Sequence, residues 1–212
     1  MSTDALPKPY GRADVDQIYN LLFCDHPELF RSGSVAHDSP LGIVLSPSSD
    51  IKAVRTIADD TAQESRVRAL AFHWLRQHEQ PVPIKILLGA IVEVPQDGGL
   101  DTLAAYPDGR VRYINKTGKM SIFEGAPPDI VAAAKALLER SQPVVNAIGP
   151  WDKPRLPPPA LGKVRLSFLV SDGLYFGEGA FGVFAKDAMA GPVIKAATDL
   201  LLLIVDAATK PH

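Results

Sequence analysis

Short apolar runs separated by turn signals are concentrated in residues 100–123, LDTLAAYPDGRVRYINKTGKMSIF. Asp108-Gly109 has residue types that can take positive φ angles at both positions of a tight two-residue hairpin. Residues 115–118, NKTG, predict a second turn, of four residues, with glycine in the left-handed conformation. The aromatic and β-branched residues of the flanking runs suit a half-buried pleated surface. The stretch therefore predicts a three-stranded antiparallel meander.

Two other segments carry strand patterns. Residues 84–94, IKILLGAIVEV, are apolar on both faces for most of their length, which favours a place in the middle of a sheet. Residues 164–170 and 174–176 flank Asp172-Gly173, which is another tight-hairpin signal. Together with the meander, these segments predict a mainly antiparallel sheet.

Helical spacing of apolar residues accounts for most of the remaining chain. A short helix is expected from Asp14, acting as its N-cap, to Pro27, which stops it. A second helix spans about residues 50–78, with a break in its first half, and residues 41–45 before it could be a strand or a buried connector. Pro127-Pro128 opens a third helix, because proline is tolerated in the first turn.

The last predicted helix, about residues 191–208, contains the unbroken apolar run 200–205. A helix that is apolar all round must be covered on more than one side. We expect it to lie either between the sheet and the N-terminal helices or against a second subunit.

These elements predict an α+β fold, with a mainly antiparallel sheet, helices packed on one face and an N-terminal helical portion. The expected organisation is a disordered or extended N-terminus followed by a single α+β domain. Its parts are residues 1–13 (N-terminus), 14–80 (helical portion), 81–148 (strands, meander and helix), 149–162 (a proline-rich strap) and 163–212 (hairpin and C-terminal helix). Five prolines in the strap favour extended polyproline geometry, as in a semi-rigid surface connector.

An internal repeat is suggested by an offset of 64 residues, which relates Asp108-Gly109 to Asp172-Gly173 and Pro128 to Pro192. In both stretches a hairpin is followed by a helix that begins with proline and ends in apolar residues. A duplicated strand–strand–helix unit would place a groove between two halves, where a ligand could bind. The alternative is that two alanine- and leucine-rich helices match by composition alone.

Composition excludes several classes of protein. The chain has 212 residues, a net charge of −2 and one cysteine, so it can form neither an intramolecular disulfide nor a cysteine-based zinc site. The small net charge gives no overall field that favours nucleic acid or an anionic membrane. The N-terminus lacks the pattern of a secretory signal, and the longest apolar run is too short to span a bilayer. We therefore expect a cytoplasmic protein with no membrane contact.

Three motifs resemble functional sites, but the surrounding sequence does not support a functional role for any of them. Residues 177–182, GEGAFG, match G-x-G-x-x-G, but no βαβ unit for a nucleotide can form around them, so close packing or a bulged strand explains the glycines better. His73 and His78 are five residues apart, whereas helical zinc-binding pairs lie four apart. Cys24 lies near the apolar stripe of the first helix, so we interpret it as a structural thiol and not as a nucleophile for His26. We expect no cofactor, no metal and no catalytic residue.

A local excess of positive charge marks the meander, where Arg110, Arg112, Lys116 and Lys119 occur with no acidic residue among them. With the aromatic rings between them, these cations could hold a phosphate or single-stranded nucleic acid. The alternative is a solvated outer face whose lysines prevent pairing of a sheet edge. Trp151, in the strap, is either a lid over a pocket or a peg that holds the strap. The candidate ligand-binding residues are Arg110, Arg112, Tyr113, Asn115, Lys119, Trp151 and Glu178.

The leading hypothesis is a non-enzymatic binding or assembly protein that forms a homodimer through a sheet edge or the C-terminal helix. Its further partner, a small molecule or a protein, is left open. The second hypothesis is an enzyme whose site assembles from distant residues, Arg112, Tyr113, Asn115 and Glu178, in a groove near the two hairpins. The third is binding of an anion or nucleic acid by the basic face, which the overall negative charge disfavours.

Two segments, GGLDTLAAYPDGRVRYINKTGK and NAIGPWDKPR, resemble a group of uncharacterised bacterial proteins that share an LAAY-x-DG-x-x-RYIN core. The resemblance covers roughly residues 84–208 and is weakest in the N-terminal helices. It implies a bacterial source, and it implies no activity, ligand or catalytic residue.

Overall fold

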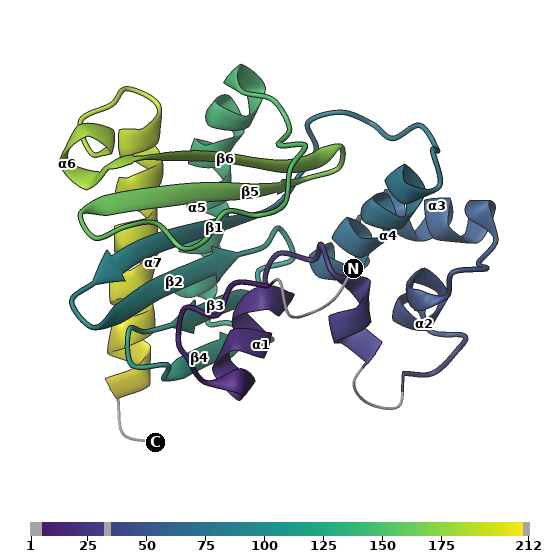
Figure 1. Cartoon of the computed structure of the whole chain (residues 1–212), viewed down its shortest axis with the longest axis horizontal. Helices are drawn as coiled ribbons and strands as arrows, with labels where there is room; N and C mark the ends of the chain where they lie inside the picture. The colour runs from purple at the N-terminus through teal and green to yellow at the C-terminus, as the bar shows by residue number, and fades with distance from the viewer. Residues whose placement is uncertain (1–5, 32–34, 210–212) are drawn as a thin grey trace.

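A six-stranded antiparallel sheet lies at the centre of the molecule (Figure 1). It is seen in a computed structural model that describes residues 6–31 and 35–209. The strand order is β4-β3-β2-β1-β5-β6, and every neighbouring pair is antiparallel. The strands are β1 (Leu87–Gln96), β2 (Gly99–Ala105), β3 (Val111–Ile114), β4 (Met120–Phe123), β5 (Lys163–Val170) and β6 (Gly173–Ala180). The predicted antiparallel sheet and its meander, β2 to β4, are thereby confirmed.

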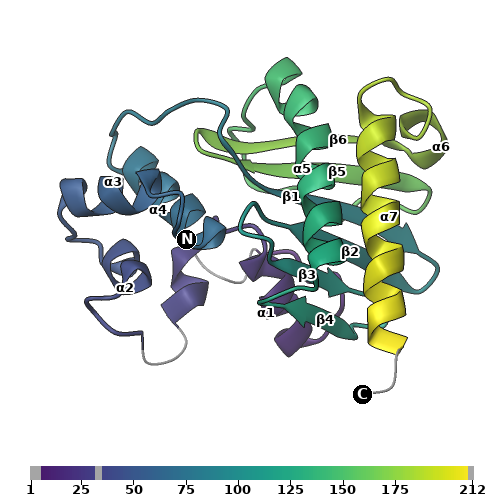
Figure 2. The same ribbon diagram turned by 180° about the vertical axis from the view of Figure 1, so that it is seen from behind.

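Two long helices cover one face of the sheet (Figure 2). They are α5 (Pro128–Ala147) and α7 (Ala190–Thr209), and their buried side chains form an apolar core with residues of the strands. Pro128 stands at the start of α5, as predicted, because a helix leaves its first N–H groups unpaired in any case. Among the helices that the structure describes, none combines the length and apolar character needed to span a bilayer.

The other face of the sheet is covered by N-terminal segments and by the strap (Figure 1). Helix α1 (Ala13–Leu21) packs against this face, while the remaining N-terminal helices lie beyond one end of the sheet. These are the 3₁₀ helix η2 (Pro27–Arg31), α2 (Pro40–Leu45), α3 (Ile51–Asp59) and α4 (Ser65–Gln77). The long C-terminal helix therefore does not lie between the sheet and the N-terminal helices, which was one of its two expected positions.

The start of the chain is only partly described. Residues 1–5 of the predicted disordered or extended N-terminus lie outside the described residues. Residues 6–12 are irregular, and the Tyr10 hydroxyl lies 2.9 Å from Thr102 Oγ1 on β2. The first helix begins at Ala13 with Arg12 as its N-cap, so the predicted capping role of Asp14 is wrong. Asp14 lies in the first helical turn, where its negative charge still favours the helix N-terminus.

The hairpin at Asp108-Gly109 differs from the predicted two-residue turn. Among its residues only Gly109 has a positive φ, of 82°, and Gly109 N donates to Tyr106 O. The loop therefore has three residues, a turn through Pro107 and Asp108 followed by a left-handed glycine. A two-residue loop would need Pro107 to donate an N–H to Arg110 O, and proline has none, so the closing bond runs from Tyr106 N to Arg110 O. The second predicted turn is confirmed, with Gly118 at φ 79°.

Local features explain two further departures. Residues 40–45 form helix α2 and not a strand, because the Ser39 hydroxyl caps the helix by accepting from Gly42 N and Pro40 occupies its first position. The predicted break in residues 50–78 is confirmed, since α3 and α4 are separated there. Asp50 caps α3 through its side chain.

The two stretches related by the 64-residue offset are alike only in part. Each contains a hairpin followed by a long helix, and α5 and α7 lie side by side on the same face (Figure 2). Between hairpin and helix, however, the first stretch has strand β4 and the second has the short helix α6 (Phe181–Phe184).

The glycine-rich residues 177–182 serve close packing. Strand β6 is antiparallel to β5 and runs directly into α6, so the segment does not connect a parallel strand to a long helix. The Phe184 ring lies against Gly177 and Gly179, and a Cβ atom at Gly179 would overlap that ring. The predicted packing role is confirmed for this pair of glycines.

This packing predicts a difference between two substitutions. Gly179→Ala forces the Phe184 ring to move and is expected to lower the free energy of unfolding by about 1–3 kcal/mol. Gly182→Ala is the matched control, because a Cβ atom there meets no atom within 4 Å. Urea unfolding of both variants measures the effect, and equal stabilities would contradict the packing role.

Candidate functional site

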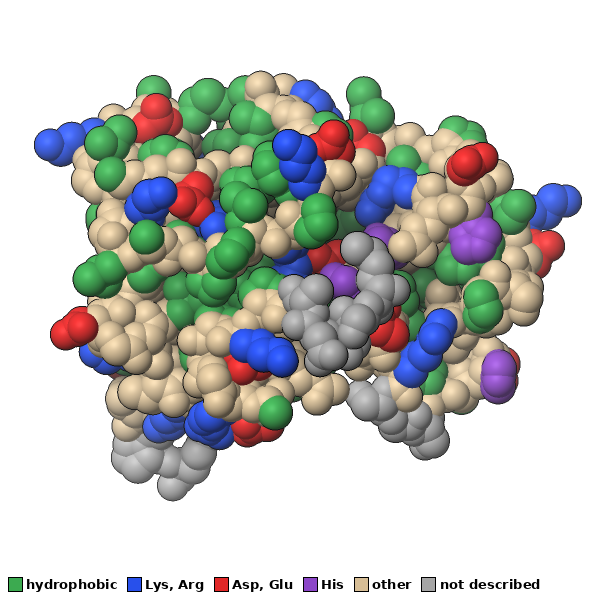
Figure 3. All heavy atoms as spheres, viewed as in Figure 1, with side chains coloured by type: hydrophobic (Ala, Val, Ile, Leu, Met, Phe, Trp, Pro, Cys, Tyr) green, Lys and Arg blue, Asp and Glu red, His purple; other side chains and the backbone are tan. Residues whose placement is uncertain are grey.

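The two arginines of the meander pair with carboxylates in the β2–β3 turn and just after β4. Arg110 Nε lies 2.8 Å from Glu124, and its Nη1 lies 3.2 Å from Asp108. Arg112 is 5% exposed and its Nη2 lies 2.5 Å from Glu124. On the face seen in Figure 3, side chains of both signs are interspersed with apolar ones. The charges of Arg110 and Arg112 are therefore neutralised locally, whereas Lys119 remains exposed.

The residues of the enzyme hypothesis are not brought together. Asn115 Oδ1 accepts from the backbone N–H groups of Thr117 and Lys119, so it stabilises its own turn. Tyr113 and Arg112 are adjacent on β3 and point to opposite faces. Glu178 lies on β6, four strand spacings or about 19 Å from β3.

Trp151 holds the strap to the edge of the sheet. Its backbone N–H donates to Leu174 O on β6 at 2.7 Å, and its ring meets Phe176 edge to face at 5.1 Å. Its indole N–H donates to Pro154 O within the strap. This geometry agrees with Trp151 as a peg that holds the strap, and not with Trp151 as a lid over a pocket.

A buried polar cluster, which the sequence analysis did not identify, lies under the strap. Glu93 is fully buried on the internal strand β1, and Tyr19 on α1 donates a 2.7 Å hydrogen bond to its Oε1. Arg165 on β5 approaches Oε2 at 3.8 Å. Arg165 also pairs with Glu178 at 2.6 Å and donates to the carbonyl of Pro157 in the strap. The cluster thus connects α1, the sheet and the strap.

A second arginine anchors the strap to the N-terminal part. Arg155 Nε lies 2.6 Å from Asp25, and its Nη2 donates to Asn20 Oδ1 at 2.7 Å. Its guanidinium lies 4.1 Å from the centre of the Phe23 ring, a cation–π distance. The space that remains beside these arginines is about 10 Å³, room for at most one water molecule. The cluster is therefore a packed core feature and not an open cleft.

Burial raises the pKa of Glu93, and this outweighs the opposing influence of its hydrogen bond from Tyr19 and of the Arg165 charge. The physical reason is that Arg165 makes its close contact with Glu178 and only a distant one with Glu93. Within the part of the chain that the structure describes, Glu93 Oε2 has no hydrogen-bond partner. The sequence signal that could have revealed this cluster is Glu93 itself, a single carboxylate in the apolar run 84–94, which was predicted to lie mid-sheet.

Cys24 and three histidines, which were not predicted to form a site, make structural contacts. Cys24 is buried, and burial raises the pKa of its thiol to about 12, while His26 pairs with Glu28. His78 stacks on Trp74, and burial lowers the pKa of His73 to about 4. Among residues 6–31 and 35–209, no three His, Cys, Asp or Glu residues are placed to hold a metal.

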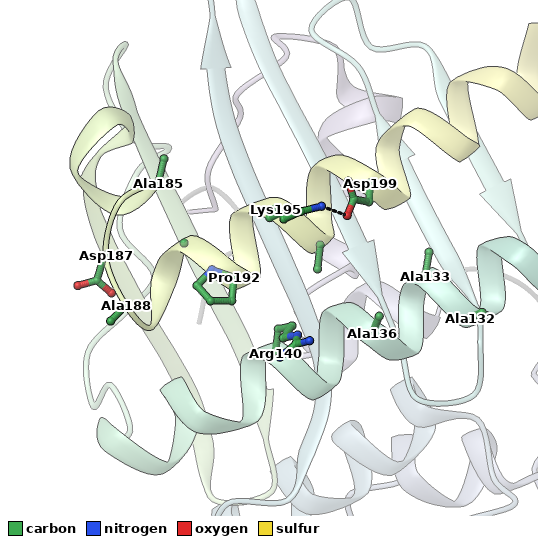
Figure 4. Close-up of a pocket in the computed structure, with 12 residues that line it drawn as sticks. Ala132, Ala133, Ala136, Arg140, Ala185, Asp187, Ala188, Pro192, Lys195 and Asp199 are labelled. Atoms are coloured by element: carbon green, nitrogen blue, oxygen red, sulfur yellow. Dashed lines mark hydrogen bonds and ion pairs between the residues drawn. The ribbon is translucent and has the colours of Figure 1, made fainter.

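A groove of about 870 Å³ lies between α5 and α7 (Figure 4). The two helices are antiparallel, since Arg140 lies near Pro192 while Ala133 lies toward Asp199. Small side chains form most of its floor and walls: Ala132, Ala133, Ala136, Ala185, Ala188, Gly191 and Ala196. Charged groups of both signs stand at its rim, including an exposed Lys195–Asp199 pair at 2.7 Å. The groove is open, apolar at its base and suited to a rod-like partner.

The environment of Glu93 predicts a pH dependence of folding. Because its pKa is raised in the folded protein, the folded state binds the proton more tightly than the unfolded state does. This contribution to stability is complete below about pH 4.3 and is lost as pH rises through the raised pKa, with a slope of up to about 1.4 kcal/mol per pH unit. Glu93→Gln should remove this part of the profile, and the exposed Glu139→Gln should leave it in place. Urea unfolding from pH 4 to 8 measures both, and a Glu93→Gln profile identical to wild type would contradict the assignment.

Comparison with known proteins adds no residue roles to this geometry. No family model matches the chain, and comparisons with the curated proteins and with the solved structures found no match. The resemblance of the LAAY-x-DG-x-x-RYIN core therefore stays a prediction, and the function has to be inferred from the contacts described above.

Proposed function

We propose that this is a non-enzymatic bacterial binding or assembly protein that acts as a homodimer, with the outer surface of α5 and α7 as its interface. The observation that carries the proposal is the groove between these helices, together with apolar side chains left open beside it. One side of α7 packs on the sheet through Val193, Ala197 and Leu200. Its outer side exposes Leu202 at 63% and Val205 at 45%.

The size of this surface fits a protein partner. Each helix has 20 residues and is therefore about 30 Å long, and two adjacent helices are about 20 Å wide. The layer thus offers about 600 Å² per copy, or about 1,200 Å² in a symmetric pair, which is the lower limit for stable interfaces. Alanines in the groove allow the backbone of a partner helix to approach closely.

The charges at the groove favour a second copy of the same chain. A two-fold interface must be complementary to itself, so it needs both signs of charge within one patch. Arg140 and Lys195 supply positive charge, and Asp199 supplies negative charge at the same rim. In a pair of copies, Lys195 of one can face Asp199 of the other.

The two sheet edges are poorer candidates. Strand β4 has only four residues, and β6 contains Gly177 and Gly179 and is bridged by Trp151 at its first end. Short, glycine-bearing and partly covered edges offer few backbone groups for pairing. The neutralised arginines and the dispersed residues of the meander give no support to the nucleic-acid and enzyme hypotheses.

A double substitution on α7 tests the proposal. Leu202→Asp with Val205→Asp places two charges in the proposed interface and should raise the dimer dissociation constant by roughly a hundredfold or more. Size-exclusion chromatography with light scattering, over a range of protein concentrations, measures the mass.

The matched control is Leu161→Asp, because Leu161 is 69% exposed and lies in the strap, outside α5 and α7. This variant should remain dimeric. A wild-type protein that keeps the monomer mass of 22.8 kDa at the highest concentration would refute the dimer.

A further inference from the structure

A second, smaller cavity lies between the sheet and α7 and has a volume of about 190 Å³. Its walls are apolar and come from three strands and two helices. They are Val92, Val94, Leu103, Val164, Phe181, Ile194, Ala197 and Leu201. The polar residues around it are Gln96, Asp101, Tyr113 and Thr198. An apolar cup with a few convergent polar groups is the usual form of a small-molecule site.

This cavity and the α5–α7 groove lie on different sides of α7. The helix contributes Ile194, Thr198 and Leu201 to the cavity, and Lys195 and Asp199 to the groove. At 100° per residue, the centres of these two sets differ by about 110° around the helix axis, so the cavity and the groove border different sides of α7. A molecule in the cavity therefore does not occupy the proposed dimer interface.

The polar end of the cavity is a tyrosine hydroxyl paired with a carboxylate. The Tyr113 hydroxyl donates to Asp101 Oδ1 at 3.1 Å, and Lys116 N donates to the same oxygen at 2.8 Å. These bonds hold Asp101 in place from two directions. Burial, followed by the charge of Asp101, raises the pKa of Tyr113, so its hydroxyl remains protonated and keeps donating.

Asp101 retains binding capacity after these two bonds. Within the described residues it forms no ion pair, and its Oδ2 accepts no hydrogen bond. None of the twelve residues that line the cavity is Lys, Arg or His. The site thus presents an uncompensated negative charge beside apolar walls and the aromatic ring of Tyr113, whose face attracts cations.

We propose that this cavity binds a small organic ammonium ion, with its apolar body against the strands and α7 and its charged nitrogen at Asp101 and Tyr113. The volume sets the size of the ligand, since an apolar protein cavity of about 150 Å³ accommodates benzene. A single aromatic ring or a short branched alkyl group on a primary amine fills a space of this size. An anion is excluded by the carboxylate, and a neutral molecule of the same shape gains the apolar contacts and at most a hydrogen bond, without the ion pair.

Benzylamine is the test probe, and benzyl alcohol and benzoate are its neutral and anionic counterparts. Each is titrated into the full-length ¹⁵N-labelled protein and followed by backbone amide shifts. Benzylamine should bind in the millimolar range, with shifts concentrated at Leu103, Tyr113 and Thr198. Benzyl alcohol can donate one hydrogen bond to the carboxylate but carries no charge, so it should bind at least about tenfold more weakly because the ion pair is lost. Benzoate should not bind.

Two variants locate the site. Asp101→Asn keeps an acceptor for Tyr113 and Lys116 N and should weaken benzylamine at least about tenfold. Asp199→Asn removes a carboxylate from the groove side of α7 and should leave the affinity unchanged. Thr198→Phe fills the mouth of the cavity from an exposed position and should abolish binding even if Asp101→Asn is unstable.

Three results would overturn the inference: no benzylamine shifts in this cavity, equal binding of amine and alcohol, or unchanged affinity in Asp101→Asn. The result of the benzylamine experiment can be distinguished from the result of the dimer experiment. Benzylamine should bind equally to the single Leu202→Asp variant, because Leu202 does not line the cavity and follows Lys195 by two turns on the groove side of α7.

Discussion

The buried carboxylate of Glu93 is the constraint to which one whole face of the sheet is adapted. A charged group without water must be compensated by hydrogen bonds and opposite charge, or it binds a proton. Tyr19 supplies the hydrogen bond from α1, and Arg165 supplies a distant positive charge from β5. Arg165 in turn holds the strap through two of its backbone carbonyls. The positions of α1 and of the strap on this face are therefore coupled through one polar cluster.

The opposite face is organised by α7, which is more apolar than a helix that covers one sheet needs to be. Its packed stripe faces the strands, while its flanks border the large groove on one side and the small cavity on the other. The groove has small side chains and mixed charge, which suits a second protein surface. The cavity has a single uncompensated carboxylate, which suits a small cation. One helix thus separates two surfaces of different chemistry.

The secondary structure and the class of fold could be predicted from local patterns. Apolar runs broken by Asp-Gly and Asn-x-x-Gly signals gave the strands, and proline-opened apolar stripes gave α5 and α7. The details of the first hairpin could not be seen in Asp108-Gly109 alone, because Pro107 decides the loop length. The run of residues 84–94, apolar on both faces for most of its length, favoured two covered faces, yet helices were expected on only one.

The polar clusters could not be predicted, because their partners are far apart in sequence. Arg155 and Asp25 are 130 residues apart, and Tyr19 and Glu93 are 74 apart. Which residues meet depends on strand order and register, and neither is encoded in local spacing. For the same reason, Arg112, Tyr113 and Glu178 could be grouped by type but lie on different faces or distant strands. Asp101 was overlooked because nothing in its sequence neighbourhood distinguishes it from a solvated carboxylate.

The strand order has a consequence for how the chain reaches this structure. Every neighbouring pair in the sheet joins consecutive strands except β1 and β5, where 72 residues separate Glu93 from Arg165. The hairpins on either side can form from contacts close in sequence, whereas this central pairing must close a long loop that contains the meander and α5. Loop closure costs conformational entropy before any contact repays it, and distant pairings slow folding. The zipping of β1 to β5 is accordingly the step that should limit the folding rate, and it is the step that buries Glu93.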